Sequence, residues 1–303
     1  MPPIQEELRR RTRLSRPQVR IRRAEVVRTA EPAPRIRRIT IGGPDLAGCA
    51  DGALPADAWK FLLPPDGRGP VHLPVIGADG MPGYEPGAVP PIMRAFTVRS
   101  VDPAANELTV DVLLHGDTPA TVWARHAAPG DLVGLAGPRH EFFASPEAGW
   151  HLLAGDESAL PAIATIIESL PADTPVVALI EVRDEADRID IAAPAGAEVH
   201  WLYRGGAPEA GSGLLEKAVR GLDRPFADAQ VWIGAEAAAV RSVRRHLLDE
   251  RGLPRPQLQA AAYWKRSLTS DQRDIEVFAA YQAAVAAGGD PDDPALTTEA
   301  DLA

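Results

Sequence analysis

The sequence predicts two domains, an antiparallel β-barrel followed by an α/β domain with a parallel sheet. Short β-patterned runs separated by Pro- and Gly-rich turns fill the first half. Beyond about residue 147, strands alternate with amphipathic helices, as in βαβ units. The 303 residues suffice for two cores. We expect a basic N-terminal arm at 1–16, the barrel at 17–146, the α/β domain at 147–266 and an extension at 267–303.

The barrel half contains six expected strands and one helix. The strands are 19–28, 35–41, 59–63, 95–101, 108–114 and 132–137. Segment 64–91 has little periodicity and is expected to form a long loop. The helix should begin with Thr118 as its N-cap and Pro119 as its first residue, where the missing N–H costs nothing.

The second half contains five expected strands and three main helices. The strands are 150–155, 175–182, 198–203, 229–235 and 258–264, and the helices are 157–170, 212–222 and 237–252. Ser158 is placed as the N-cap of the first of these helices. A further helix is expected at 271–287, followed by an acidic tail of the disordered type.

Composition excludes several classes of protein. The single cysteine, Cys49, rules out a disulfide framework and a Cys-ligated iron–sulfur or zinc site, so redox chemistry needs a bound organic cofactor. No run of 18 apolar residues and no N-terminal apolar region occurs, which predicts neither a membrane span nor a secretory signal. The lone cysteine fits a reducing cytoplasm, and we expect a monomer. Residues 1–38 hold twelve arginines and four acids. The remainder is so acidic that we expect the basic arm to dock on it rather than on nucleic acid.

Residues 90–138 place several anion-binding features together. Arg94 opens a strand, and its guanidinium is a bidentate donor for a diphosphate. Phe96 lies on the same face and can cover a flat ring. The neighbouring strand ends at His115, just before a helix N-terminus that favours anions and carries the hydroxyls of Thr118 and Thr121. The combination predicts a diphosphate site.

The first turn of the α/β domain differs from a Gly-x-Gly-x-x-Gly fingerprint. Gly155 suits a tight strand-to-helix turn at the ligand-binding edge of the sheet. Asp156 and Glu157 would repel a diphosphate, so we expect them to cap the helix or to meet a ribose or the nicotinamide amide. The choice between NADH and NADPH stays open, because a 2′-phosphate needs an arginine near the second strand and three are candidates, namely Arg183, Arg188 and Arg204.

Five separated motifs resemble those of the siderophore-interacting protein family. They are "MRAFTVRSVD", "HGDTPATVWA", "PGDLVGLAGPRHEF", "LLAGDESALPAI" and "AAYWKRS", in order between residues 17 and 266. The family comprises FAD-containing ferric-siderophore reductases of the ferredoxin-reductase-like superfamily. The resemblance implies that the barrel binds FAD, that the α/β domain binds NADPH or NADH, and that a ferric siderophore is the partner. Phe96 replaces the family's usual tyrosine.

The resemblance also implies a set of site residues. Cofactor contacts are assigned to Arg94, Phe96, Thr97, Asp111, His115, Gly116, Ala120, Thr121, Gly155, Asp156, Glu157, Ser158, Ala235 and Glu236. The basic residues Lys60, Arg139 and Lys265 are assigned to the often anionic substrate. No protein metal ligand and no acid/base dyad is expected, because the iron arrives bound by its siderophore and the flavin mediates the chemistry.

The predicted function is that of an FAD-dependent NAD(P)H:ferric-siderophore reductase. Hydride passes from the nicotinamide to the flavin, and single electrons then pass to Fe(III). Two alternatives stay open from the sequence. One is a flavin or electron-carrier reductase with another acceptor, and the other is a protein that binds a siderophore or a flavin without catalysis.

Overall fold

The computed structural model describes residues 10, 21–49, 51–76, 82–208, 211–266, 268 and 270–288. The predicted basic arm at 1–16, apart from Arg10, and the acidic tail after residue 288 lie outside the described residues. The chain divides into two compact units between His140 and Glu141. None of the described helices has the length and apolar character needed to cross a bilayer.

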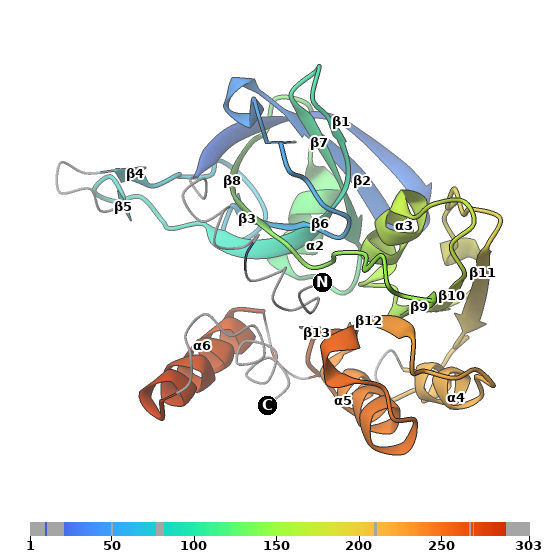
Figure 1. Ribbon diagram of the computed structural model, residues 1–303. Coiled ribbons are helices and arrows are strands. Elements are labelled where there is room, and N and C mark those ends of the chain that lie inside the picture. Colours follow the sequence, from blue (N-terminus) through green and yellow to red (C-terminus); the bar gives the residue numbers. More distant parts are fainter. Residues whose placement is uncertain are drawn as a thin grey trace. The chain divides into compact units, whose positions relative to one another are not determined.

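The first unit is a closed six-stranded antiparallel barrel (Figure 1), as predicted. Neighbouring strands follow the order β1-β2-β7-β6-β3-β8. The strands are β1 (Arg22–Ala33), β2 (Ile36–Gly42), β3 (Ala58–Leu63), β6 (Ile92–Asp102), β7 (Glu107–Leu113) and β8 (Leu132–Arg139). Alternate residues such as Ile39, Ile41 and Phe61 fill the interior, and α2 (Pro119–His126) adds Trp123 and Ala124 to this core.

The predicted loop at 64–91 contains two short strands. They are β4 (Val75–Ile76) and β5 (Pro82–Gly83), which pair antiparallel outside the barrel sheet (Figure 1). Each strand has only two residues, which explains why no alternating pattern announces them in the sequence.

The second unit is built on a five-stranded sheet in which every neighbouring pair is parallel. The order is β11-β10-β9-β12-β13. From β9 the chain first adds β10 and β11 on one side and then β12 and β13 on the other. The strands are β9 (Trp150–Asp156), β10 (Val176–Val182), β11 (Ala197–Tyr203), β12 (Ala229–Glu236) and β13 (Leu258–Trp264). Together with the barrel, this sheet confirms the predicted fold class.

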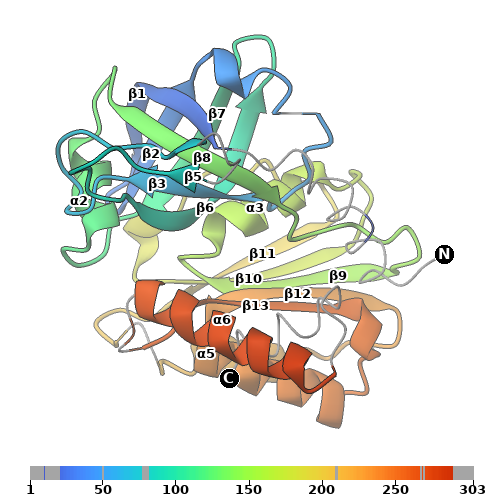
Figure 2. The same ribbon diagram turned by 90° about the vertical axis from the view of Figure 1, so that its left-hand side faces the viewer.

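Helices cover both faces of the parallel sheet, with α3 on one face and α4 and α5 on the other (Figure 2). The helices are α3 (Leu160–Ser169), α4 (Leu214–Arg220), α5 (Ala237–Arg245) and α6 (Ser270–Ala286), and a π-helical turn, His246–Glu250, follows α5. Side chains of α4 and α5 pack with Leu152, Val231 and Ile233 in one core. Because both faces are covered, the central strands β9, β10 and β12 are buried along their length.

Two buried glutamines attach the segment after the barrel to the second unit. Gln230 on β12 accepts from the backbone N–H of Ser145 (2.8 Å) and donates to the carbonyl of Phe143 (2.7 Å). Gln259 on β13 donates to the carbonyl of Glu141 (3.1 Å). These hydrogen bonds explain why residues from 141 onward belong to the second unit.

Candidate functional site

The start of α2 is tied to the end of strand β7. Thr118 is the N-cap, and its hydroxyl accepts from the N–H of Thr121 (3.3 Å), while Pro119 is the first helical residue, as predicted. The hydroxyl of Thr121 donates to the carbonyl of His115 (2.9 Å). This contact fixes the loop that joins β7 to the helix.

Several backbone donors at this helix start have no acceptor. In the described part of the chain, the N–H groups of Gly116, Asp117, Thr118 and Ala120 make no hydrogen bond. Gly116 has φ +55°, and a Cβ added there would meet no atom within 4 Å, so open space adjoins these donors. Free N–H groups and the positive end of a helix dipole together favour an anion.

An aromatic cluster lies beside the same helix. Phe96 on β6 is half-buried and stacks on Trp123 of α2, with ring centroids 6.1 Å apart and planes 21° apart. Phe61 on β3 meets Phe96 edge to face at 5.1 Å. The indole Nε1 of Trp123 is buried and has no hydrogen-bond partner. Arg94 lies two residues before Phe96 on β6, with Phe61 as its Cα partner on β3.

These residues fit an FAD. The helix start offers free N–H groups to a diphosphate, Arg94 offers a guanidinium, and Phe96 offers an aromatic face. The buried indole N–H of Trp123 is a further donor without an acceptor in the protein. The fit therefore rests largely on donors that the chain itself leaves unsatisfied.

Two predicted cofactor residues of the barrel, Asp111 and Thr97, are buried in strands β7 and β6. Asp111 is buried on β7, and both of its carboxylate oxygens accept from Arg38 on β2 at 2.7 Å. Thr97 is buried on β6 and pairs with Ala58 of β3. Asp111 thus has a cross-strand structural role, and cofactor contact by either residue stays a prediction.

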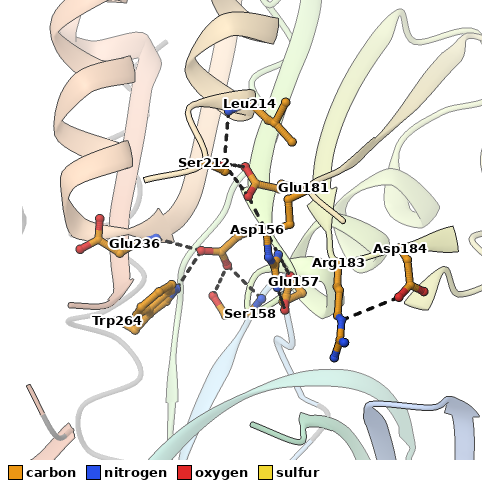
Figure 3. A network of polar contacts seen from close by, with 11 residues as sticks. Asp156, Glu157, Ser158, Glu181, Arg183, Asp184, Ser212, Leu214, Glu236 and Trp264 are labelled. Carbon is orange, nitrogen blue, oxygen red and sulfur yellow. Dashed lines mark hydrogen bonds and ion pairs between the residues drawn. The ribbon is translucent and has the colours of Figure 1, made fainter. Parts of the chain in front are cut away.

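In the second unit, the carboxylate of Asp156 joins three strand ends (Figure 3). One oxygen, Oδ1, accepts from both the N–H and the hydroxyl of Ser158, and Oδ2 accepts from the N–H of Glu236 (2.9 Å) and from Nε1 of Trp264 (2.8 Å). Burial raises the pKa of Asp156, and the hydrogen bonds from Ser158 and Trp264 oppose that shift. Contact of Asp156 with a nucleotide stays a prediction.

The expected N-cap at Ser158 is wrong by one residue. Helix α3 begins at Leu160, and Ala159 occupies the N-cap position without a side-chain hydrogen bond. The hydroxyl of Ser158 donates to Asp156 instead. The buried carboxylate is the stronger acceptor and organises the turn in place of a cap.

A second buried polar network extends from this edge toward β11 (Figure 3). Glu157 forms a bidentate ion pair with Arg204, of which one contact is 2.6 Å. Arg204 also lies 3.9 Å from Glu181 at the end of β10, and Ser212 donates to Glu181 at 2.7 Å. Burial raises the pKa of Glu181, an effect that the Ser212 hydrogen bond opposes.

The three arginines proposed for a 2′-phosphate differ in exposure. Arg204 is 7% exposed and held inside the network, whereas Arg183 and Arg188 have side chains that are 58% and 47% exposed. Arg188 lies over the ring of Trp201 at 5.3 Å. A 2′-phosphate can therefore reach Arg183 or Arg188 without separating a buried ion pair.

The remaining predicted nucleotide residues have structural roles at the sheet edge. A Cβ on Gly155 would lie 2.5 Å from the carbonyl oxygen of Gly234, so the close approach of β9 and β12 requires glycine there. Ala235 is buried in β12, and Glu236 caps α5 by accepting from the N–H groups of the second and third residues after it. This edge is where the strand order reverses, the position at which such folds bind ligands.

The three basic residues assigned to the substrate fall in two places. Lys60 and Arg139 lie on the neighbouring strands β3 and β8, where Arg139 pairs with Ala58 and Lys60 with Ala136. Arg139 is exposed, whereas Lys60 is half-buried. Lys265 follows β13 in the other unit, and its ammonium lies 3.6 Å from Glu276 of α6.

Sequence patterns missed three polar features near these residues. They are the unpartnered indole of Trp123, the hydrogen bond from Trp264 to Asp156, and a buried pair between Asp57 and His140 (2.8 Å). Each depends on residues far apart in the chain, so no local motif marks them. Among the described residues, no three His, Cys, Asp or Glu side chains gather to hold a metal ion.

Comparison with known proteins assigns both units. Residues 25–142 match the family of siderophore-interacting FAD-binding domains, and residues 148–267 match the siderophore-interacting protein family. The ferric vibriobactin reductase ViuB of Vibrio cholerae is 32% identical over 245 residues, which are 80% of this chain and 88% of ViuB. The uncharacterised protein Rv2895c of Mycobacterium tuberculosis is 36% identical over 263 residues, 82% of this chain and 91% of that protein.

A solved structure extends the match to three dimensions. The siderophore utilization protein from T. fusca is 37% identical, with a TM-score of 0.73, and the match covers 83% of this chain and 95% of that one. The matched families cover the barrel and the parallel-sheet unit in the order found here. The chain therefore belongs to the siderophore-interacting protein family.

Proposed function

We propose that this protein is an FAD-dependent NAD(P)H:ferric-siderophore reductase that releases iron by reducing siderophore-bound Fe(III) to Fe(II). The observation that carries the proposal is helix α2 of a barrel of the siderophore-interacting FAD-binding type, because its start has unsatisfied backbone donors and its Trp123 stacks on Phe96. The 32% identity with a ferric vibriobactin reductase supports the choice of acceptor.

The barrel residues bind and orient the cofactor in this proposal. The free N–H groups from Gly116 to Ala120, with His115 and Thr121 shaping the turn, hold the diphosphate, and Arg94 neutralises its charge. Phe96 supplies an aromatic face that its stack on the buried Trp123 holds in place, and the indole N–H of Trp123 is a donor without a partner in the protein. FAD, when bound, would accept two electrons from the nicotinamide as a hydride and would pass them one at a time to Fe(III).

The second unit binds the reductant at the edge where its strand order reverses. The acids there are already hydrogen-bonded within the protein, as Asp156 and Glu157 illustrate. Contacts to NADH or NADPH therefore come from backbone groups and from exposed side chains of the loops after β9 and β12. Lys60 and Arg139 attract the anionic ferric chelate, and Lys265 contributes when it leaves Glu276.

The proposed setting is a monomer in the cytoplasm that does not bind nucleic acid. Support comes from the acidic composition, with a net charge of −10, and from a lone buried cysteine. Gel filtration and retention on heparin in rising salt would test the oligomeric state and the absence of nucleic-acid binding.

An anaerobic spectrum of the purified protein tests the function. The flavin band at about 450 nm should bleach with NADPH or NADH and return when a ferric hydroxamate or ferric catecholate is added, with Fe(II) trapped by a chelator. Bleaching without return would leave a reductase for another acceptor. Failure to bind FAD after reconstitution would refute the proposal.

Two matched variants test the cofactor site within one strand. Arg94→Ala should lower FAD affinity about tenfold or more, because it removes a charge-assisted contact to the diphosphate. Arg99→Ala, on the same strand β6, is the control and should retain the wild-type affinity. Equal losses in both variants would show that β6 is generally perturbed and would remove Arg94 from the proposed site.

A further inference from the structure

A buried carboxylate–imidazole pair closes the β3–β8 ladder of the barrel. Asp57 directly precedes β3 and His140 directly follows β8, so the pair comes next after Ala58 and Arg139. Nδ1 of His140 lies 2.8 Å from Oδ1 of Asp57, and the two side chains are only 6% and 3% exposed. The other oxygen of Asp57 accepts from the N–H of Leu54 (2.9 Å), which fixes the carboxylate.

The contact with Asp57 uses only one of the two imidazole nitrogens of His140, Nδ1. Nε2 of His140 makes no hydrogen bond in the described part of the chain, and it is not among the buried polar atoms that lack a partner. The small exposed fraction of the His140 side chain, 6%, is available to Nε2 because Nδ1 faces Asp57. A carboxylate on Nδ1 fixes the orientation of the ring and directs Nε2 away from Asp57.

Three basic residues lie on the strands that flank this pair, and the acidic Glu141 directly follows His140. Arg139 and Lys60 come from β8 and β3, and the guanidinium of Arg22 from β1 lies over the ring of Trp59 at 5.1 Å. Asp57 is the one carboxylate in direct contact with the imidazole among the described residues. Arg139 directly precedes His140 in the chain, so a chelate attracted to Arg139 would approach this end of the β3–β8 ladder.

We infer that His140 is a proton donor to the ferric siderophore during iron release, oriented by Asp57. This inference rests on the proposed function. Bound FAD would supply the electron that reduces Fe(III) to Fe(II), and an Fe–O bond to the chelate would then break. The Nε2 proton of the imidazolium passes to the oxygen that leaves iron, giving a hydroxyl on the chelate and a neutral imidazole. The imidazole regains its proton from water.

The chemistry explains why a donor is useful at this step. The oxygens of hydroxamates and catecholates are basic once iron leaves them, so at neutral pH each takes up a proton. A positioned general acid typically accelerates such a step by about 10²–10⁴-fold. Histidine is suited because its ring has two nitrogens, so one can be held by a carboxylate while the other exchanges a proton. Asp57 is a positioning residue, since it contacts only the far side of the ring.

Anaerobic rapid kinetics on the FAD-loaded protein separate the two half-reactions. In His140→Gln, bleaching of the flavin by NADPH or NADH should keep its wild-type rate. Trapped Fe(II) from a ferric hydroxamate should appear at least about tenfold more slowly. The wild type should show a solvent deuterium isotope effect on Fe(II) release that the variant lacks. His72→Gln, which removes an exposed histidine of the same unit, is the control.

Binding of the redox-inert gallium(III) complex of the same hydroxamate distinguishes proton transfer from substrate positioning. Affinity should be equal in the wild type and His140→Gln. The inference would be overturned if His140→Gln bound the gallium complex so weakly that this alone explained its slower Fe(II) release. It would also be overturned if His140→Gln released Fe(II) at the wild-type rate. If the variant does not fold, the absence of an isotope effect in the wild type would overturn it as well. Failure of the wild type to release Fe(II) at all would refute the proposed function instead.

Discussion

A buried histidine makes the stability of the second unit depend on pH. His151 on β9 is 2% exposed, and its ring packs against Phe142 with centroids 6.3 Å apart. Its Nδ1 is buried without a hydrogen-bond partner. Burial lowers the pKa of His151 from 6.5 to about 4, because the charged ring would have neither water nor a counter-ion. The folded protein therefore holds this imidazole neutral.

The sign and size of the effect follow from linkage. Between about pH 4 and 6.5 the unfolded chain binds a proton at His151 and the folded chain does not, so stability rises with pH across this window. Each pH unit is worth about 1.4 kcal/mol. Acidification from about pH 7.5 to about pH 5 crosses roughly 1.5 units of the window and should cost about 2 kcal/mol from this one group.

Substitution by leucine isolates the contribution. His151→Leu removes the titrating ring and its unsatisfied nitrogen at similar volume, so stability near pH 7.5 should be equal to or higher than that of the wild type. Urea denaturation followed by tryptophan fluorescence gives the unfolding free energy at each pH. Hydrogen exchange of β9 peptides assigns the change to the second unit.

A matched control is available on the same sheet. His200→Leu removes a histidine of β11 whose side chain is 52% exposed, and it should leave the pH dependence of the wild type unchanged. The wild type should lose about 2 kcal/mol more than His151→Leu between the two pH values. Parallel losses in the wild type and His151→Leu would refute the assignment of a depressed pKa to this ring.

Three further variants and one control test the polar contacts of the second unit, each by urea denaturation unless stated. Gln230→Leu should cost about 2 kcal/mol, because it leaves backbone groups of the 141–145 segment without partners. Arg204→Met should cost about 3–5 kcal/mol by leaving buried carboxylates unpaired, whereas the exposed Arg188→Met should cost less than about 1 kcal/mol. Asp156→Asn places an amide N–H₂ against donors and should shift the fluorescence of Trp264, and an unchanged spectrum would contradict the hydrogen bond between them.

Local pattern was sufficient for most of the fold. The barrel strands alternate inward and outward, as the burial of β1 illustrates, and the central strands of the second unit are almost continuously apolar, as in β10. Alternating and continuous apolar patterns therefore predicted which half forms an antiparallel barrel and which half forms a parallel sheet. The strand at Arg94 starts two residues before this arginine, at Ile92, because pairing with β3 extends to Leu63. Tertiary pairing, which local sequence does not encode, sets such ends.

The site was predictable only where its signal is local. Thr118 and Pro119 announce a helix start by residue type, and the helix begins there. In contrast, the indole donor to Asp156 and the partner of Asp111 come from residues distant in the chain. A carboxylate in a sequence is equally compatible with a ligand contact and with an internal hydrogen-bond network, and only the packing decides between them.

The acids at the edge of the parallel sheet bear on how a dinucleotide approaches it. Asp156 and Glu181 are both buried, and burial raises the pKa of each. Their charges are also shared with internal donors, since Asp156 accepts hydrogen bonds from Glu236 and Trp264, and Glu181 accepts from Ser212. A diphosphate at this edge therefore meets carboxylates whose oxygens already accept hydrogen bonds from the protein. Because their pKa values are raised, these carboxylates also take up a proton at a lower free-energy cost than exposed acids do. Both effects lower the repulsion that the row of acidic residues alone implies.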